Sequence, residues 1–281
     1  MKNKIEIIKN SGQTQYYDEK KLYSSLSKTH SSESIKLKIL DEVRHRLKNG
    51  MTTKEIYQMA FKILKNKSRV NASRYKLKRA IMELGPSGFP FENFIGTILK
   101  HEGYRTDVGV IVQGHCVTHE VDVVAIKDNV HLMVECKYHN TQNQNCDVKI
   151  PLYINSRFKD IEEEWKKNKG HGSKFHYGCI YTNTRFTKDA LQYGECAGLK
   201  LTSWDYPKDN SLKFRIDLLG LHPLTSLMSL SRAEKTMLLN NNIVLCKEIH
   251  ENPDLLNEIG ISKIRQKKIL DDSKKLCESK I

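Results

Sequence analysis

The chain has 281 residues, of which 38% are hydrophobic, so it holds enough apolar material for the cores of two or three soluble domains. No stretch approaches the roughly 18 apolar residues that a membrane-spanning helix needs, which excludes a bilayer protein. A formal net charge of +14 favours a polyanionic partner such as nucleic acid, although a basic surface kept for solubility would have the same composition.

Seven cysteines are dispersed along the chain without a C-x-x-C pair. This pattern favours free thiols in a reducing cytoplasm over a disulfide framework. His115, Cys116 and His119 are close in the sequence, but no second ligand pair follows at the spacing of a zinc finger. We therefore predict a cytoplasmic protein without a structural zinc site.

Residues 1–86 are expected to form a mainly helical domain that begins with small strands. Ile5–Ile8 is a short alternating stretch that leads into a turn at Gly12. Apolar residues then recur at helical spacing, and the last helix of this part is expected over Ala72–Leu84. Gly85–Gly88 reads GPSG, which is typical of a linker.

Residues 89–215 alternate helical and strand patterns, which predicts a mixed β-sheet flanked by helices. An amphipathic helix comes first, with Phe91, Phe94, Ile95, Ile98 and Leu99 at helical spacing. The expected strands are 108–112, 121–126, 132–134, 177–181 and 199–203, and further helices are expected over 152–166 and from Thr187.

Residues 216–281 have the pattern of short helices, so the whole chain is predicted to be a multi-domain α/β protein. Ser231 and Glu234 match a capping box. Ile259–Ser262 and the basic stretch Lys263–Lys268 are similar to a degenerate helix-hairpin-helix, which presents backbone N–H groups to a DNA phosphate. A small helical cap for packing or dimerisation explains the same residues equally well.

Charged residues interrupt one of the predicted strands, in the run HLMVECKYHN at 131–140. Because side chains alternate along a strand, Glu135 and Lys137 share one face, and a hairpin would bring Asp122 beside them. Two carboxylates and the Cys136 carbonyl suit Mg²⁺ or Mn²⁺, and Lys137 could orient an attacking water or stabilise charge on a phosphate. The simpler alternative is a surface ion pair between Glu135 and Lys137 and an exposed Asp122.

This part of the chain resembles the PD-(D/E)xK nuclease superfamily, and in particular its Mrr-like restriction endonuclease branch. The matching residues are Phe91-Glu92, Gly103-Tyr104, Val121-Asp122, Glu135-Cys136-Lys137, Tyr181 to Thr187 with Ala190, and Gly198 to Leu201. The resemblance implies that Asp122 and Glu135 hold metal, that Lys137 assists the attacking water, and that Glu92 adds an outer carboxylate. It also implies double-stranded DNA as substrate. The branch often has Gln where this chain has Glu135, a difference that favours metal binding.

Polar residues continue beyond this motif. His139, Asn140, Gln142, Asp147 and Lys149 could line a DNA path or form an ordinary polar loop. Arg157 and Lys159 on the following helix could contact phosphates or belong to a solvated helix face.

Residues 3–85 resemble the ATP-cone, a regulatory domain known from ribonucleotide reductases. The matching residues are Ile8-Lys9, Gly12, Tyr17-Asp18, Lys20-Lys21-Leu22, Gly50 to Thr53, Ile56, Ala72, Arg74-Tyr75 and Leu77. The resemblance implies ATP or dATP as ligand and a change of oligomeric state as output, with Lys9, Lys20, Lys21, Thr53, Arg74 and Tyr75 as the binding residues. The family's second basic residue after Lys9 is Asn10 here, which could alter phosphate recognition.

Two functions follow from these resemblances. The first is a Mg²⁺-dependent DNA endonuclease that adenine nucleotide controls, in defence against foreign DNA. Cutting both strands with one site per chain favours at least a homodimer. The alternative is a nucleotide-responsive DNA-binding regulator built on an inactive nuclease fold. Cleavage of RNA or branched DNA by the same site is a third reading.

Overall fold

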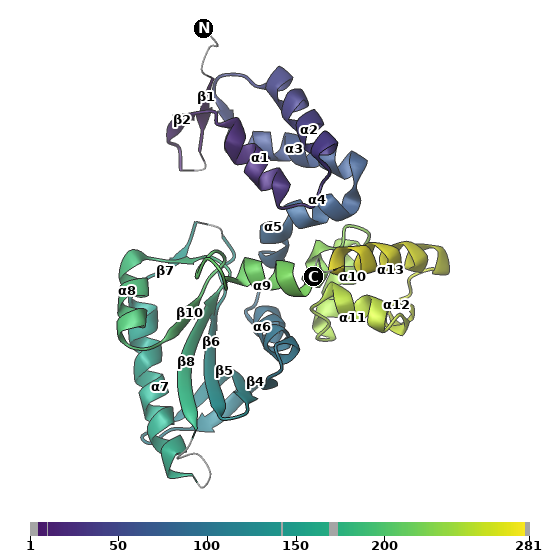
Figure 1. The fold of residues 1–281 in the computed structure, drawn as a ribbon. Coiled ribbons are helices and arrows are strands. Elements are labelled where there is room, and N and C mark those ends of the chain that lie inside the picture. Colours follow the sequence, from purple (N-terminus) through teal and green to yellow (C-terminus); the bar gives the residue numbers. More distant parts are fainter. Residues whose placement is uncertain (1–4, 10, 142, 169–173, 279–281) are drawn as a thin grey trace.

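The structure is a computed structural model that describes residues 5–9, 11–141, 143–168 and 174–278 (Figure 1). Thirteen α-helices and three β-sheets are assigned in these ranges. The chain is thus a mixed α/β protein, as its sequence patterns predict. None of the helices in the described ranges is long and apolar enough to cross a membrane.

The N-terminal unit combines a small sheet with four helices. Its strands are ordered β2-β1-β3, with β1 antiparallel to β2 and parallel to β3. The helices bury Leu26, Ile39, Val43, Ala60 and Leu64 in one core. The elements are β1 (Glu6–Ile8), β2 (Thr14–Tyr16), α1 (Glu19–Ser27), α2 (Glu33–Arg46), β3 (Met51–Thr52), α3 (Thr53–Lys67) and α4 (Arg69–Tyr75).

The single helix expected over Ala72–Leu84 is wrong, because the chain forms two helices, α4 and α5 (Leu77–Ile81), with a break at Lys76. Neither Gly nor Pro marks this break. The two halves bury their side chains in different cores: Ala72 packs in the N-terminal unit, and Leu77 packs in the central one. Tertiary packing therefore decides where the helix ends.

The central unit is built on a five-stranded sheet of order β10-β8-β6-β5-β4. Strands β4, β5 and β6 are antiparallel neighbours, whereas β6, β8 and β10 run parallel. Asp128 adopts a left-handed conformation (φ 51°) in the predicted turn between β5 and β6. The strands are β4 (Arg105–Gln113), β5 (Thr118–Lys127), β6 (Val130–Lys137), β8 (Phe175–Thr182) and β10 (Lys200–Thr202), and a separate pair comprises β7 (Asn145–Cys146) and β9 (Arg185–Phe186).

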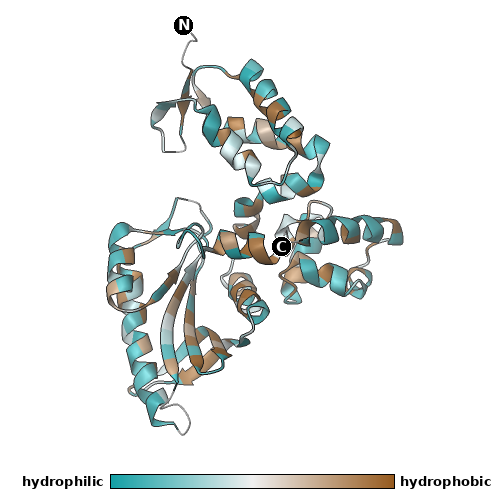
Figure 2. Cartoon of the chain, viewed as in Figure 1, coloured by the Kyte–Doolittle hydropathy of each residue, from teal (hydrophilic) through white to brown (hydrophobic). Residues whose placement is uncertain are grey.

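Helices cover both faces of this sheet (Figure 1). On one face α6 (Phe89–His101) and α9 (Leu212–Leu219) share a core with Val123, Val134 and Cys136. On the other, α7 (Lys149–Lys167) and α8 (Lys188–Cys196) pack against Val121, Val124 and Met133. Figure 2 shows apolar residues along the central strands and α9 and hydrophilic residues over much of α7. Alternate residues of β6 therefore enter different cores.

The C-terminal unit is helical and has a core of its own, which includes Leu224, Leu256 and Ile269. The predicted capping box of Ser231 and Glu234 is present, and Gly260 makes a left-handed turn (φ 74°) before the last helix. Its elements are the 3₁₀-helix η1 (Leu224–Ser226), α10 (Arg232–Asn240), α11 (Cys246–Glu251), α12 (Asp254–Glu258) and α13 (Lys263–Cys277).

The three units pack together closely. Leu77, Ile81 and Leu84 precede the expected linker but belong to the central core, and so do Val244 and Leu245 from the C-terminal part. The domain ranges 1–86, 89–215 and 216–281 stay predictions, and the cores show that apolar contacts cross both boundaries.

Candidate active site

Asp122 and Glu135 meet where the pairing of β5 with β6 ends. The last backbone pair of the register is Val123 with Val134. One residue further, Asp122 Oδ2 accepts a hydrogen bond of 2.7 Å from the backbone N–H of Cys136. The carboxylate thus replaces a backbone carbonyl at the end of the ladder. In an antiparallel pair, the N–H and C=O of one residue point to the same neighbour, so the Cys136 carbonyl also faces β5.

Glu135 is buried among cations. Val134 and Cys136 enter the core beneath α6, so Glu135 projects on the α7 face and is only 7% exposed. Its Oε1 lies 3.4 Å from Lys137 Nζ, and its Oε2 lies 2.8 Å from Arg157 Nη1. The ion pair with Lys137 exists, but it does not match the surface pair considered from the sequence, since the carboxylate is buried. A buried carboxylate needs such partners to remain ionised.

Arg157 completes the site from α7. The sequence allowed either a phosphate contact or a solvated helix face, yet this side chain points inward to Glu135 and to the backbone carbonyl of Glu120. Lys159, in contrast, is exposed and pairs with Glu162 on its own helix. Arg157 points inward because α7 packs on the sheet. The local sequence around Arg157 does not predict this packing.

Burial and neighbouring carboxylates raise the pKa values of Glu92 and Asp122. Burial, with Asp122, Glu120 and Glu135 nearby, raises the pKa of Glu92 on α6 to about 7. Burial and Glu135 raise the pKa of Asp122 to about 6, although the Cys136 N–H, Arg157 and Lys137 oppose the shift. Glu92 therefore lies within electrostatic range of Asp122 and Glu135, and Asp122 lies within range of Glu135 and Lys137. A cation bound among them would relieve the repulsion.

The donors suit a hard cation that keeps much of its water. In the described ranges, no group of three or more His, Cys, Asp or Glu side chains is arranged to hold a metal ion. Mg²⁺ commonly takes only one or two carboxylates and completes its shell with waters and substrate oxygens. Asp122, Glu135 and the Cys136 carbonyl fit that requirement, and a cation there would compete with Arg157 for Glu135.

The sequence neighbours His115, Cys116 and His119 have a structural explanation. His119 Nε2 lies 2.7 Å from Asp160 Oδ2, and Asp160 Oδ1 accepts the Cys116 N–H at 2.7 Å. One carboxylate on α7 thus holds the turn between β4 and β5. His119 and Cys116 thus take part in the contact between α7 and the β4–β5 turn.

The segment after β6 is hydrogen-bonded to the residues that join α5 to α6. Tyr138 Oη donates to the Met82 carbonyl at 2.8 Å and accepts from the Gly85 N–H at 3.0 Å. Asn183 bonds both the N–H and the carbonyl of His139, at 2.9 and 2.8 Å. Sequence reasoning missed Tyr138 and Asn183. Of the other flanking residues, Asn140, Asp147 and Lys149 are exposed, and Gln142 lies outside the described residues.

The N-terminal unit contains a cavity of about 220 Å³ at the residues proposed for nucleotide binding. Lys21, Thr53 and Tyr75 line it, together with Tyr17 and Tyr57, which sequence reasoning did not assign. The rings of Tyr57 and Tyr75 stack with centroids 4.8 Å apart. Whether these residues bind nucleotide stays a prediction.

The other three proposed nucleotide ligands lie elsewhere. Lys9 and Lys20 are not among the residues that line the cavity. Arg74 Nη2 donates to the carbonyls of Lys275, Leu276 and Glu278 at 3.0, 3.3 and 3.4 Å. The structure thus places Arg74 at the end of α13 and not at the cavity.

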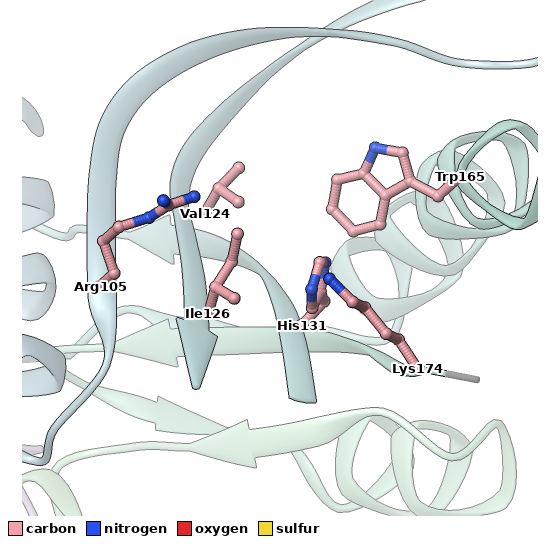
Figure 3. Close-up of a pocket in the computed structure, with 6 residues that line it drawn as sticks. All are labelled: Arg105, Val124, Ile126, His131, Trp165 and Lys174. Atoms are coloured by element: carbon pink, nitrogen blue, oxygen red, sulfur yellow. The ribbon is translucent and has the colours of Figure 1, made fainter. Parts of the chain in front are cut away.

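A second hollow, of about 490 Å³, lies at the opposite end of β6 from Glu135 (Figure 3). Trp165, His131 and Lys174 face Arg105 across it, with Val124 and Ile126 between them. Because neither Asp122 nor Glu135 lines it, it is separate from the candidate active site.

Comparison with known proteins places the chain in a family. An uncharacterized protein of Archaeoglobus fulgidus is 33% identical over 180 residues, a match that covers 64% of this chain and 97% of the relative. The crystal structure of AF1548, a protein of unknown function, is 31% identical with a TM-score of 0.56, and covers 68% of this chain and 98% of that one. The chain belongs to the AF1548-like family.

Two further matches describe this AF1548-like protein. The family domain described as AF1548-like, C-terminal, matches residues 222–277, the helical unit that ends in α13. A structure of the MspJI restriction endonuclease in complex with a 27-mer oligonucleotide is 10% identical with a TM-score of 0.30, and covers 72% of this chain and 39% of that one. A TM-score this low carries no argument about function.

The raised carboxyl pKa values predict that the metal-free AF1548-like protein loses stability as pH rises. The ordinary pKa of Asp122 is 3.8 and that of Glu92 is 4.5, so the folded state holds protons that the unfolded chain releases between about pH 4 and 7. The loss of folding stability caused by ionising Asp122 and Glu92 is therefore absent below this pH window and complete above it. Asp122→Asn keeps an oxygen for the Cys136 N–H and should raise the free energy of unfolding at pH 8 by about 1–2 kcal/mol, after solvent screening.

Urea unfolding in EDTA at pH 5 and pH 8 measures this effect. The gain in Asp122→Asn should appear at pH 8 and shrink at pH 5. Added Mg²⁺ should stabilise the wild type at pH 8 more than it stabilises the variant. An identical pH dependence for both proteins would show that Asp122 does not carry the shift.

Proposed function

We propose that this protein is a DNA endonuclease that depends on Mg²⁺ or Mn²⁺ and that adenine nucleotide regulates. The observation that carries the proposal is the convergence of Asp122 and Glu135 at the ends of adjacent strands. Asp122 accepts the N–H of Cys136, the residue next to Glu135, and Lys137 lies beside Glu135. Two carboxylates and a backbone carbonyl can hold a divalent cation, and a lysine beside them can assist the hydrolysis of a phosphodiester.

Each residue has a defined role in this proposal. Asp122, Glu135 and the Cys136 carbonyl would hold the cation, and Glu92 would act as an outer carboxylate. The bound cation would supply the positive charge that polarises the scissile phosphate. Lys137, whose Nζ is 3.4 Å from Glu135, would orient the attacking water and stabilise charge developing on the phosphate. Arg157 would leave Glu135 when the cation binds and could then pair with a phosphate oxygen.

The N-terminal cavity supports the regulatory half of the proposal. Lys21 offers a cation for phosphates, Thr53 a hydroxyl, and the stacked Tyr57 and Tyr75 an aromatic wall for a base. We infer that ATP or dATP binds there and changes the oligomeric state. Cleavage of both DNA strands with one site per chain favours at least a homodimer, and defence against foreign DNA in the cytoplasm is the setting that we propose.

Supercoiled plasmid incubated with Mg²⁺, with and without ATP or dATP, tests the proposal directly. We expect nicked or linear products that EDTA abolishes and that nucleotide changes in yield. The alternative, a nucleotide-responsive DNA-binding regulator, is favoured by one observation: both Glu135 oxygens are already paired, with Lys137 and Arg157. Wild-type protein that binds DNA but leaves plasmid, linear DNA and RNA intact in every nucleotide condition would support that alternative.

The nucleotide proposal makes a prediction for two adjacent lysines. Lys21 lines the cavity and Lys20 does not, although the ATP-cone resemblance includes both. Lys21→Ala should weaken ATP binding by about tenfold, because a charge-assisted phosphate contact is lost, whereas Lys20→Ala should change the affinity less than about threefold. Isothermal titration calorimetry measures both values. Equal losses in the two variants would contradict the assignment of the cavity.

A further inference from the structure

A cleft of about 730 Å³ lies between the N-terminal unit and the segment that follows β6. One side is formed by α3, which contributes Lys54, by Tyr75 of α4, and by α5, which contributes Lys78 and Arg79. Asn140 and Asn143 form the opposite side. In Figure 1 the carboxyl end of β6 points toward the N-terminal unit, so the cleft lies above the end of the strand that carries Glu135.

The cleft has a surplus of positive charge. None of the residues that line it is acidic. The nearest acid in sequence to Lys54 is Glu55, whose carboxylate turns back to the N–H and hydroxyl of Thr52 at 2.7 and 2.8 Å. Arg79 pairs with Glu83, but Glu83 is shared with Lys76. Burial and the nearby Arg185 lower the pKa of Lys78, although Asp205 opposes the shift.

The cleft is directly connected to the candidate active site. Asn140 is three residues beyond Lys137, and its Nδ2 reaches the Pro86 carbonyl at 3.4 Å. Met82, on the floor of the cleft, accepts the hydrogen bond from Tyr138, the residue next to Lys137. A strand of DNA whose phosphate lay at Glu135 would therefore have this basic surface along its path.

The cleft also shares a wall with the nucleotide cavity. Thr53, Tyr57 and Tyr75 line both spaces, and the two tyrosine rings stack at an interplanar angle of 10°. A ligand that shifts these rings from the cavity side changes the surface of the cleft. Contact between two sites through one shared element is a physical route for coupling.

We propose that this cleft binds the sugar-phosphate backbone of DNA next to the cleavage site, and that the Tyr57–Tyr75 pair transmits nucleotide occupancy to it. The proposal rests on the proposed nuclease function and names the step that nucleotide controls, which is the binding of DNA. The cations on α3 and α5 can each bind a phosphate, and the two asparagine amides can bond phosphate or sugar oxygens. Specific bases need not be read in this cleft.

The test measures binding of a fluorescein-labelled DNA duplex to the full chain in EDTA, by anisotropy over a range of salt concentrations. The double variant Lys54→Ala/Lys78→Ala should bind about 10- to 100-fold more weakly at low salt. The negative slope of the logarithm of the association constant against the logarithm of salt concentration should become shallower by about 1.8, which is about 0.9 for each lost phosphate contact. The matched control, Lys62→Ala/Lys65→Ala, removes two exposed lysines from α3 outside the cleft and should bind like wild type.

The outcomes separate the two proposals. If the wild type binds and cuts DNA while the cleft variant keeps wild-type affinity and slope, the cleft proposal is overturned and the nuclease proposal stands. If the wild type neither binds nor cuts DNA, the nuclease proposal fails and the cleft proposal fails with it. Circular dichroism of both variants verifies that they are folded.

Adding ATP tests whether the Tyr57–Tyr75 pair couples the nucleotide cavity to the cleft. ATP should change the DNA affinity of the wild type by about fivefold or more, and Tyr57→Ala should reduce this response. ATP that binds, as calorimetry would detect, but leaves the DNA affinity unchanged would overturn the proposed role of the Tyr57–Tyr75 pair.

Discussion

Glu135→Gln and Lys137→Ala are each expected to slow plasmid cleavage about a thousandfold. Gln retains an oxygen for Arg157 but loses the negative charge that would hold the cation. Lys137→Ala removes the ammonium group that would lie next to the scissile phosphate, and loss of a preorganised charge at the reacting centre typically costs two to three orders of magnitude in rate. Single-turnover cleavage at saturating Mg²⁺ measures the effect on the chemical step.

The control for this prediction is Lys159→Ala, which removes one lysine from the solvated side of α7, where it pairs with Glu162. It should cleave at close to the wild-type rate. DNA binding in EDTA should persist in both active-site variants, which separates lost chemistry from lost affinity. Wild-type cleavage by Glu135→Gln would exclude this carboxylate as the metal ligand.

Arg74→Ala is expected to lower the free energy of unfolding by about 2–3 kcal/mol and to leave ATP affinity within about threefold of wild type. One guanidinium nitrogen bonds three backbone carbonyls at the end of α13, where a positive charge also interacts favourably with the helix dipole. Removing it leaves those carbonyls without their donor and loosens α13 from α4. Chemical denaturation and nucleotide calorimetry measure the two quantities.

Arg69→Ala is the matched control, because Arg69 is an exposed arginine of the same helix. It should change the free energy of unfolding by less than about 1 kcal/mol. An Arg74→Ala protein with wild-type stability and no ATP binding would restore Arg74 to the ligand set implied by the ATP-cone resemblance. The two readings thus predict opposite results for one substitution.

The arrangement of Asp122, Glu135 and Lys137 could be predicted from the sequence because it depends on one strand and one short turn. Strand periodicity places Glu135 and Lys137 on one face, with Val134 and Cys136 on the other, and the structure has this arrangement. A short turn at Asp128 allows only a narrow range of registers for a hairpin, so Asp122 had to approach the end of β6. The five strands of the main sheet and helices α6, α7 and α8 follow from the same periodicities, whereas the short strands β7 and β9 and the helix α9 were not predicted.

Tertiary contacts decided the features that the sequence left open or assigned differently. Arg157 faces Glu135, Arg74 faces α13, and the helix breaks at Lys76, each because of a partner distant in the sequence. Similarly, Lys21 lines the cavity and Lys20 does not. A side chain's direction is set by its own backbone, but its partner is set by how the elements pack. The sequence alone therefore determined most elements of the central sheet, the faces of β6 and the approach of Asp122 to Glu135. Only the packed structure decided where the helix breaks, which cations meet those carboxylates and which surface lies beside them.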